Sequence, residues 1–336
     1  MDKAIKNPVL ILAGDVPLIN SSTIEKMMSL YQESNAKLLC LGFKAKNPTG
    51  YGRLVSFQED IIDIVEEKDA TGEQREITLC NSGIYLVDGE LLASLVKRLK
   101  NNNNAKEYYI TDIVKLTNAD GHRCVVHVTK ESEVMGVNDK IQLAEVEKLT
   151  QRKLRKMHLK NGVTMIDPNS VFLSEDTVIG RDVRIHPNVI IGEKVKIEDG
   201  VEILPFSHLA NCVIGDKCKV GNFVEIKASD LDDGVKSSHL SYIGDAKIGS
   251  NSNIGAGTIF CNYDGYVKHK SNIGKNVFIG SNSALVSPIT IGDRAIIGAG
   301  SVVTEDVPNN TLTIARARQS NYEQRADLIR ERKKAK

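Results

Sequence analysis

The sequence lacks tryptophan, and aromatic residues make up only 5% of its 336 residues. A folded core must therefore be built mainly from aliphatic side chains, and the hydrophobic content of 41% is too high for a disordered chain. An excess of charge of one sign is also lacking, because 44 basic and 43 acidic residues leave a net charge of +1. This balance gives no support for a protein that binds nucleic acid or a membrane surface.

Long apolar stretches are missing as well. No run approaches the roughly 20 residues that a membrane-spanning helix needs, so we expect no membrane insertion. The apolar run at residues 9–13 is too short for the apolar region of a signal peptide. No cysteine belongs to a C-x-x-C pair, and we expect free thiols in a reducing cytoplasm. The six cysteines are Cys40, Cys80, Cys124, Cys212, Cys218 and Cys261.

The first part of the chain, residues 1–138, is predicted to form an α/β domain. Residues 8–13 form an apolar run that ends in a Gly-Asp pair, which is typical of a parallel strand buried on both faces. Residues 21–33 have helical spacing, with Ser21 or Ser22 as the N-cap. Because strands and helices alternate, we predict a mostly parallel sheet. Its further strands are expected at residues 37–43, 51–57, 61–66, 84–87 and 125–128.

Residues 163–314 follow a different pattern. An aliphatic residue followed by glycine recurs about every six residues, as in Ile179-Gly180 and Ile279-Gly280. Such hexapeptide repeats predict an all-β, left-handed parallel β-helix, in which each short strand directs one apolar side chain inward. Glycine and asparagine are expected at its corners, where φ is positive. Prisms of this kind usually assemble as homotrimers, with sites in the clefts between subunits.

Two further segments complete the predicted organisation. Residues 139–162 have an apolar stripe among charged residues and are predicted to be a helical linker. Residues 315–336 are rich in arginine and lysine and are predicted to be a solvated basic tail.

Several motifs break the hexapeptide pattern, and they point to one family. In this region the sequence resembles the acetyltransferase domain of the bifunctional N-acetylglucosamine-1-phosphate uridyltransferase/glucosamine-1-phosphate acetyltransferases. The first half resembles the uridyltransferase domain of the same family, which implies an α/β nucleotidyltransferase-like (Rossmann-like) fold. The motifs are GNFVE at 221–225, SHLSYIGD at 238–245, NIGAGT at 253–258, CNYDG at 261–265, GDVPL at 14–18, PTGYGR at 48–53, EEKDAT at 66–71, EYYITD at 107–112 and EVMGVN at 133–138.

The resemblance implies acetyl transfer from acetyl-CoA to glucosamine 1-phosphate. This reaction needs a base for the amine, a nearby thioester and a hydrogen-bond donor for the oxyanion. His239 matches the family's base, a role that suits an imidazole near neutral pH. Lys227, Tyr242 and Asn253 match sugar-phosphate contacts. The positions that match acetyl-CoA contacts are Ala256, Asn262, Tyr263, Ser281, Ala299 and Arg316.

The resemblance also implies uridyl transfer from UTP, which gives UDP-N-acetylglucosamine, a precursor of the cell envelope. Asp15 and Asn138 match the family's two Mg²⁺ ligands, and hard cations prefer such oxygen donors. The positions that match contacts to UDP-N-acetylglucosamine are Gly50, Glu66, Asn81, Tyr109, Thr111 and Asn138. The expected partners are therefore these small molecules.

Two departures from the family pattern affect these expectations. One coil, which carries a phosphate-binding arginine in a Leu-Arg-Pro-Gly segment, is missing before Gly221; His208 and Lys219 are the candidate replacements. The family's Gly-rich nucleotide loop is also missing, since nothing before Val9 fits it. We therefore expect an N-terminally truncated, incomplete uridyltransferase domain with impaired activity and an exposed strand at residues 8–13.

Two alternatives remain open at this stage. A trimeric β-helix of the γ-carbonic-anhydrase type would bind zinc through three histidines in one cleft, drawn from His186, His208, His239 and His269. The chain could instead be a non-catalytic remnant that keeps the trimeric scaffold. Metal analysis tests the first alternative, and replacement of His239 tests the second.

Overall fold

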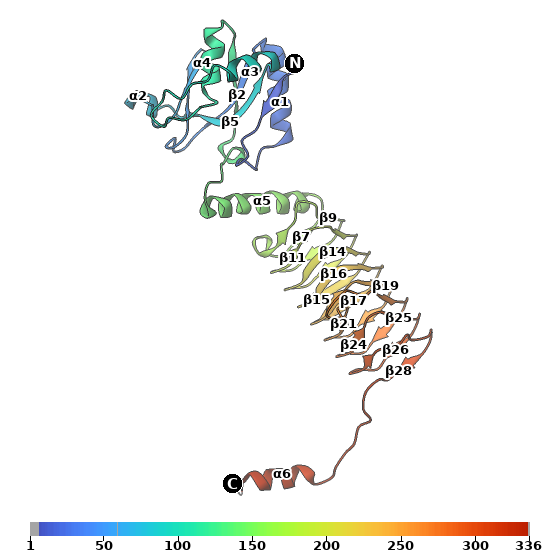
Figure 1. Cartoon of the computed structure of the whole chain (residues 1–336). Helices are drawn as coiled ribbons and strands as arrows, with labels where there is room; N and C mark the ends of the chain where they lie inside the picture. Colours follow the sequence, from blue (N-terminus) through green and yellow to red (C-terminus); the bar gives the residue numbers. More distant parts are fainter. Residues whose placement is uncertain (1–6, 59, 335–336) are drawn as a thin grey trace. The chain divides into compact units, whose positions relative to one another are not determined.

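The computed structural model describes residues 7–58 and 60–334. It divides into two compact units, Met1–Thr150 and Gln151–Lys336 (Figure 1). The division falls within helix α5 (Lys140–Lys160). Among the described residues, no helix is both long and apolar enough to span a membrane.

The first unit contains a six-stranded sheet in the order β1-β5-β2-β6-β4-β3. Strand β2 is buried on both faces, because alternate side chains enter two separate cores. Leu39 and Leu41 pack in the core that includes Met27 of α1, whereas Leu38 packs with Leu95 of α3. The elements of this unit are β1 (Val9–Ile11), α1 (Ser21–Ser34), β2 (Leu38–Lys44), β3 (Arg53–Phe57), β4 (Asp60–Val65), α2 (Gly72–Arg75), β5 (Leu79–Val87), α3 (Gly89–Val96), α4 (Asp112–Ala119), β6 (Cys124–Thr129) and the 3₁₀ helix η1 (Glu131–Glu133).

The prediction of a mostly parallel sheet is wrong for the described strands. Only β2 and β6 pair in parallel; β5 lies antiparallel between β1 and β2, and β3 and β4 form an antiparallel pair. Strand β1 is not buried on both faces, because it lies at the end of the sheet and Leu10 is 36% exposed. Among the described strands, β1 is therefore an edge strand. The N-cap of α1 is Asn20 rather than a serine.

The second unit is a parallel β-helix of hexapeptide coils, as predicted. Neighbouring coils pair in register, so that Ile185, Ile203 and Val220 stack in the interior and are fully buried. Its elements are β7 (Thr164–Met165), η2 (Pro168–Ser170), β8 (Phe172–Leu173), β9 (Val178–Ile179), β10 (Arg184–Ile185), β11 (Ile190–Ile191), β12 (Val195–Ile197), β13 (Glu202–Ile203), β14 (His208–Ile214), β15 (Lys219–Asn222), β16 (Glu225–Leu231), β17 (Lys236–His239), β18 (Tyr242–Gly244), β19 (Ala246–Ile248), β20 (Asn253–Ile254), β21 (Ile259–Cys261), β22 (Ser271–Ile273), β23 (Phe278–Ile279), β24 (Ala284–Val286), β25 (Ile289–Ile291), β26 (Ile296–Ile297), β27 (Val302–Val303), β28 (Leu312–Thr313) and α6 (Arg325–Lys334).

As predicted, glycine and asparagine occupy corners with positive φ, as at Gly257 (φ 74°) and Asn188 (φ 60°), and Phe223 (φ 56°) does so too. The glycines that follow the aliphatic residues are not at these corners. They are required by close packing instead. A Cβ atom on Gly221 would lie 1.7 Å from the carbonyl oxygen of Ser238 in the next coil.

The last turns of α5 cap the open first coil of the β-helix. Leu154 joins the interior of the prism. Gln151 donates to the Leu173 carbonyl oxygen (2.7 Å) and accepts from the Leu173 amide (2.9 Å), and Arg155 donates to the Val171 carbonyl oxygen (2.9 Å). These bonds satisfy backbone groups that would otherwise form a bare edge.

Candidate functional sites

The first candidate site is a cavity of about 460 Å³ in the first unit. It opens beside the loop after β1, the loop before β3 and the segment that precedes α5. Five of the residues predicted to bind Mg²⁺ or UDP-N-acetylglucosamine line it. They are Asp15, Gly50, Glu66, Asn81 and Asn138.

Asp15 and Asn138 meet across Gly136. The Val137 amide donates to the Asp15 carbonyl oxygen (2.9 Å), which fixes the two segments together. A Cβ atom on Gly136 would lie 3.2 Å from Oδ2 of Asp15 and 3.7 Å from Nδ2 of Asn138, so both side chains face the space that glycine leaves. Among the described residues, no group of three or more His, Cys, Asp or Glu side chains is arranged to hold a metal ion. One carboxylate and one amide nevertheless fit Mg²⁺, which commonly takes its other ligands from substrate phosphates and water.

An ion pair between a buried arginine and a partly exposed glutamate holds the loop that carries Gly50. The Arg53 side chain is 1% exposed, and its Nη2 lies 2.7 Å from Oε2 of Glu67. The same Glu67 oxygen accepts from the Gly50 amide (3.1 Å), and Arg53 also donates to the Tyr51 carbonyl oxygen. The hydrogen bond from Arg53 holds the pKa of Glu67 below its usual value. The sequence pattern did not identify this pair, since nothing local indicates a buried arginine.

Glu66 lies against Gly52, where a Cβ atom would come within 3.3 Å of both carboxylate oxygens. Burial raises the pKa of this carboxyl group. Thr111 and Tyr109 do not line the cavity, but both lie beside Glu66. The pKa of Tyr109 is raised by burial first and then by the neighbouring acidic side chains, Glu66 among them.

A bulge in β5 directs Asn81 to the cavity. The register between β2 and β5 shifts after Leu41, which leaves Ser82 and Gly83 without partners in β2, and Gly83 has a φ of 76°. The Asn81 side chain accepts from the Gly83 amide (3.2 Å) and donates to the Tyr85 hydroxyl (2.7 Å). These two bonds fix the amide at the cavity wall.

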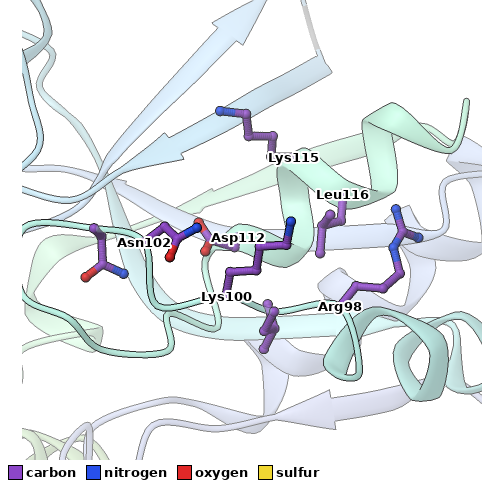
Figure 2. Close-up of a pocket in the computed structure, with 8 residues that line it drawn as sticks. Arg98, Lys100, Asn102, Asp112, Lys115 and Leu116 are labelled. Carbon is purple, nitrogen blue, oxygen red and sulfur yellow. The ribbon is translucent and has the colours of Figure 1, made fainter.

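A second hollow in this unit, of about 310 Å³, lies between the end of α3 and α4 (Figure 2). Two of its three cations have acidic partners: Arg98 binds Asp120 through two hydrogen bonds, and Lys115 lies 3.8 Å from Asp63. None of the predicted site residues lines this hollow.

The second candidate site follows one corner of the β-helix. Leu240, Gly257, Asn282 and Gly300 have φ between 50° and 74° and form this corner in four successive coils. The residue before the corner in each coil belongs to one column. That column contains the predicted base and three predicted acetyl-CoA contacts, namely His239, Ala256, Ser281 and Ala299.

Backbone hydrogen bonds connect the four positions of this column. The Gly257 amide donates to the His239 carbonyl oxygen (3.2 Å), and the Gly300 amide donates to that of Ser281 (2.8 Å). Arg316 lies at the far end, with Cδ 3.7 Å from the position of a Cβ atom on Gly300. The column therefore runs from an exposed imidazole, past three small side chains, to a guanidinium group.

Three other predicted residues meet around Gly244, on the adjoining face. Lys227 pairs in register with Gly244. A Cβ atom on Gly244 would lie 2.5 Å from the Tyr242 hydroxyl oxygen and 2.6 Å from Nδ2 of Asn262. The Asn262 amide is fixed by a hydrogen bond to Asp245 (2.5 Å), a partner that the sequence pattern did not identify.

A loop inserted after Asn262 carries Tyr263. Before the loop, paired residues in neighbouring coils are 17 positions apart in the sequence, as are Lys236 and Asn253. Across the loop the separation grows to 25, from Asn253 to Phe278. His269 lies 2.7 Å from Asp264, and this contact and two backbone amides hold the pKa of Asp264 well below its usual range.

Some predicted residues are not brought together within one chain. Asn253 stacks between Lys236 and Phe278, on a different face from Lys227. The histidines of the zinc alternative are also dispersed over the described residues: each of three contacts its own carboxylate, and the fourth is His239. The three pairs are His186 with Glu202, His208 with Glu225, and His269 with Asp264.

Comparison with known proteins agrees with both units. Residues 2–136 match the nucleotidyl transferase family, and residues 176–210, 194–228 and 270–305 match bacterial transferase hexapeptide repeats. The protein named bifunctional protein GlmU of Paramagnetospirillum magneticum is 44% identical, covering 98% of this chain and 77% of the relative. That of Agrobacterium fabrum is also 44% identical, covering 97% and 76%. The first alignment extends over 347 residues, more than the 336 of this chain, so the relative has residues that this chain lacks within the aligned region.

Proposed function

Because the chain belongs to the family of the bifunctional protein GlmU, we propose that its β-helix transfers an acetyl group from acetyl-CoA to the amine of glucosamine 1-phosphate. The main support for this proposal is the column of residues from His239 to Arg316. Coils are about 4.8 Å apart, so His239 and Ala299 are separated by about 14 Å along the prism. That length suits a pantetheine arm with its thioester at the imidazole and its phosphates at the guanidinium group.

The chemistry follows from this arrangement. The neutral amine of the sugar attacks the thioester carbonyl while His239 removes a proton from the attacking nitrogen. A carbon–nitrogen bond forms, the carbon–sulfur bond breaks, and coenzyme A leaves as the thiolate, which takes up the proton. Ala256, Ser281 and Ala299 are small enough to let the coenzyme lie close to the backbone. Lys227 supplies a positive charge for the sugar phosphate, and Tyr242 and Asn262 supply hydrogen-bonding groups next to it.

The test is acetylation by the purified full chain, followed as release of free thiol from acetyl-CoA. Thiol should be released only when glucosamine 1-phosphate is present. Ser281→Tyr should raise the KM for acetyl-CoA without changing that for the sugar, because the larger ring blocks the column. Absence of thiol release at millimolar sugar would contradict the proposal and favour the non-catalytic remnant.

For the first unit we propose uridyl transfer to N-acetylglucosamine 1-phosphate in the cavity lined by Asp15 and Asn138. When bound there, Mg²⁺ neutralises phosphate charge. Gly50, held by the Arg53–Glu67 pair, and the amide of Asn81 bind the sugar nucleotide, and Tyr109 and Thr111 shape the surroundings of Glu66.

The proposal also includes the cellular location and the oligomeric state. We expect a cytoplasmic homotrimer that acts on small molecules. Support for assembly comes from the exposed apolar column of Phe278, Ile296 and Leu312 on one face of the β-helix, whose side chains are 47–62% exposed.

A further inference from the structure

One outward face of the β-helix contains a histidine beside the proposed sugar-phosphate residues. On this face, Glu225 lies between His208 in the coil before it and Tyr242 in the coil after it. In the neighbouring column, Lys227 lies between Ala210 and Gly244. His208 and Lys227 are therefore diagonal neighbours, about 7–8 Å apart at Cα, within the reach of long side chains.

A carboxylate next to Lys227 makes this face less favourable for an anionic ligand. Lys227 carries the positive charge, but Glu225 lies two residues before it on the same face and would repel a phosphate. His208 Nδ1 lies 3.8 Å from Oε1 of Glu225, and the two side chains are 49% and 46% exposed. With Nδ1 on the side of the carboxylate, the ring still has Nε2 available to a ligand.

The small side chain of Ala210 leaves the space between His208 and Lys227 open. Ala210 is the residue below Lys227, so no bulky group separates Lys227 from the His208 ring. The stacked rings of Phe206 and Phe223, whose centroids are 4.9 Å apart, hold the corner that precedes His208 and Glu225. This stacking fixes the backbone from which the half-exposed His208 side chain extends.

We infer that His208 binds the phosphate of the amino sugar together with Lys227, and so acts as a positioning residue for the acceptor. This inference rests on the proposed acetyl transfer for the identity of the ligand. Lys219 cannot take this role, because its Nζ binds Glu202 (2.9 Å) on the face across the Phe223 corner.

The test is isothermal titration calorimetry of the full chain, without acetyl-CoA, using glucosamine 1-phosphate and unphosphorylated glucosamine as probes. His208→Gln should weaken binding of the phosphorylated sugar by about 10- to 100-fold, the range of one charge-assisted hydrogen bond, and should leave glucosamine unchanged. His208→Arg should bind the phosphorylated sugar at least as tightly as the parent chain. The matched control is His186→Gln, which removes another outward histidine that contacts a glutamate (3.1 Å) and should change neither affinity.

Three results would overturn the inference. They are an affinity of His208→Gln within twofold of the parent, an equal loss for both sugars, and a parent chain that does not distinguish the two sugars. Failure of the proposed function is a separate outcome: the parent chain binds glucosamine 1-phosphate through His208 but releases no thiol from acetyl-CoA.

Discussion

At the scale of single residues, function in this chain depends on side chains that have partners distant in the sequence. Arg53 is the clearest case, because it is a fully buried cation whose charge is offset by Glu67. The pair fixes the loop of Gly50 at the cavity of the first unit. Its removal should therefore affect both stability and binding of the sugar nucleotide.

Arg53→Met should lower the free energy of unfolding by about 3 kcal/mol. Removing one partner of a buried ion pair costs about 3–5 kcal/mol, and we expect the lower end because the Glu67 side chain is 30% exposed. Urea unfolding, followed by circular dichroism, measures this loss. Arg98→Met is the control: it removes an exposed pair with Asp120 and should change stability much less. Equal effects of the two changes would show that burial of Arg53 is unimportant.

At the scale of elements, the packing of α5 on the β-helix includes a histidine without a partner. His158, in the last turn of α5, is 4% exposed, and neither ring nitrogen has a hydrogen-bond partner within the described residues. Burial lowers its pKa. The folded state therefore holds this ring neutral in a place that cannot stabilise a charge.

This burial predicts a dependence of stability on pH. The pKa of His158 is lower in the folded state than the value of about 6.5 expected after unfolding, so the unfolded state binds more protons. Burial of the neutral His158 ring should therefore cost no stability above about pH 6.5. Below that pH, the free energy of unfolding should decrease as the pH falls. His158→Leu should reduce the difference in melting temperature between pH 7.5 and pH 5.5, whereas His122→Leu, at an exposed site, should not. An unchanged difference in His158→Leu would refute this account of α5.

The spacing of the coils gives a second prediction at this scale. A Cβ atom on Gly221 would overlap backbone atoms of Ser238, so Gly221→Ala must push two coils apart. We expect a loss of at least 2–3 kcal/mol, as for an overpacked core. Gly72→Ala is the control, since a Cβ atom there has nothing within 4 Å. Comparable urea midpoints for the two variants would contradict the close packing.

At the scale of the whole molecule, the two units differ in how far the sequence predicts them. The β-helix is predictable because its contacts lie one coil apart and repeat as a pattern of aliphatic residues and glycine. The strand order of the first unit is not predictable in this way. The antiparallel direction of β5 depends on partners far away in the chain, and local alternation of strands and helices does not encode it.

The same contrast applies to the candidate sites. The family resemblance named the residues of the column from His239 to Arg316, but their arrangement in one line follows only from the coil register. The structure brings Asp15 and Asn138 together, although 122 intervening residues separate them in the sequence. Asp245, Arg53 and Glu67 lie within the motifs that carry the resemblance but were not singled out, because each acts by holding another residue.

The proposed activities of the two units should differ in their dependence on metal. Only the uridyl transfer proposed for the first unit uses Mg²⁺, at Asp15 and Asn138. Chelation by EDTA should therefore abolish release of pyrophosphate from UTP and N-acetylglucosamine 1-phosphate and leave release of thiol from acetyl-CoA unchanged. Restoration of pyrophosphate release by added Mg²⁺ is the control. Pyrophosphate release that persists in EDTA would contradict the proposed Mg²⁺ site.

The central claim is that the β-helix is a working acetyltransferase with His239 as its base. The most direct measurement is the rate of thiol release from acetyl-CoA and glucosamine 1-phosphate by the full chain and by His239→Ala, with His186→Ala as the matched control. Loss of a general base should lower kcat by about 10²- to 10⁴-fold in His239→Ala, and the control should retain the parent rate. A His239→Ala rate equal to that of the parent chain would contradict the claim and identify the β-helix as a non-catalytic scaffold.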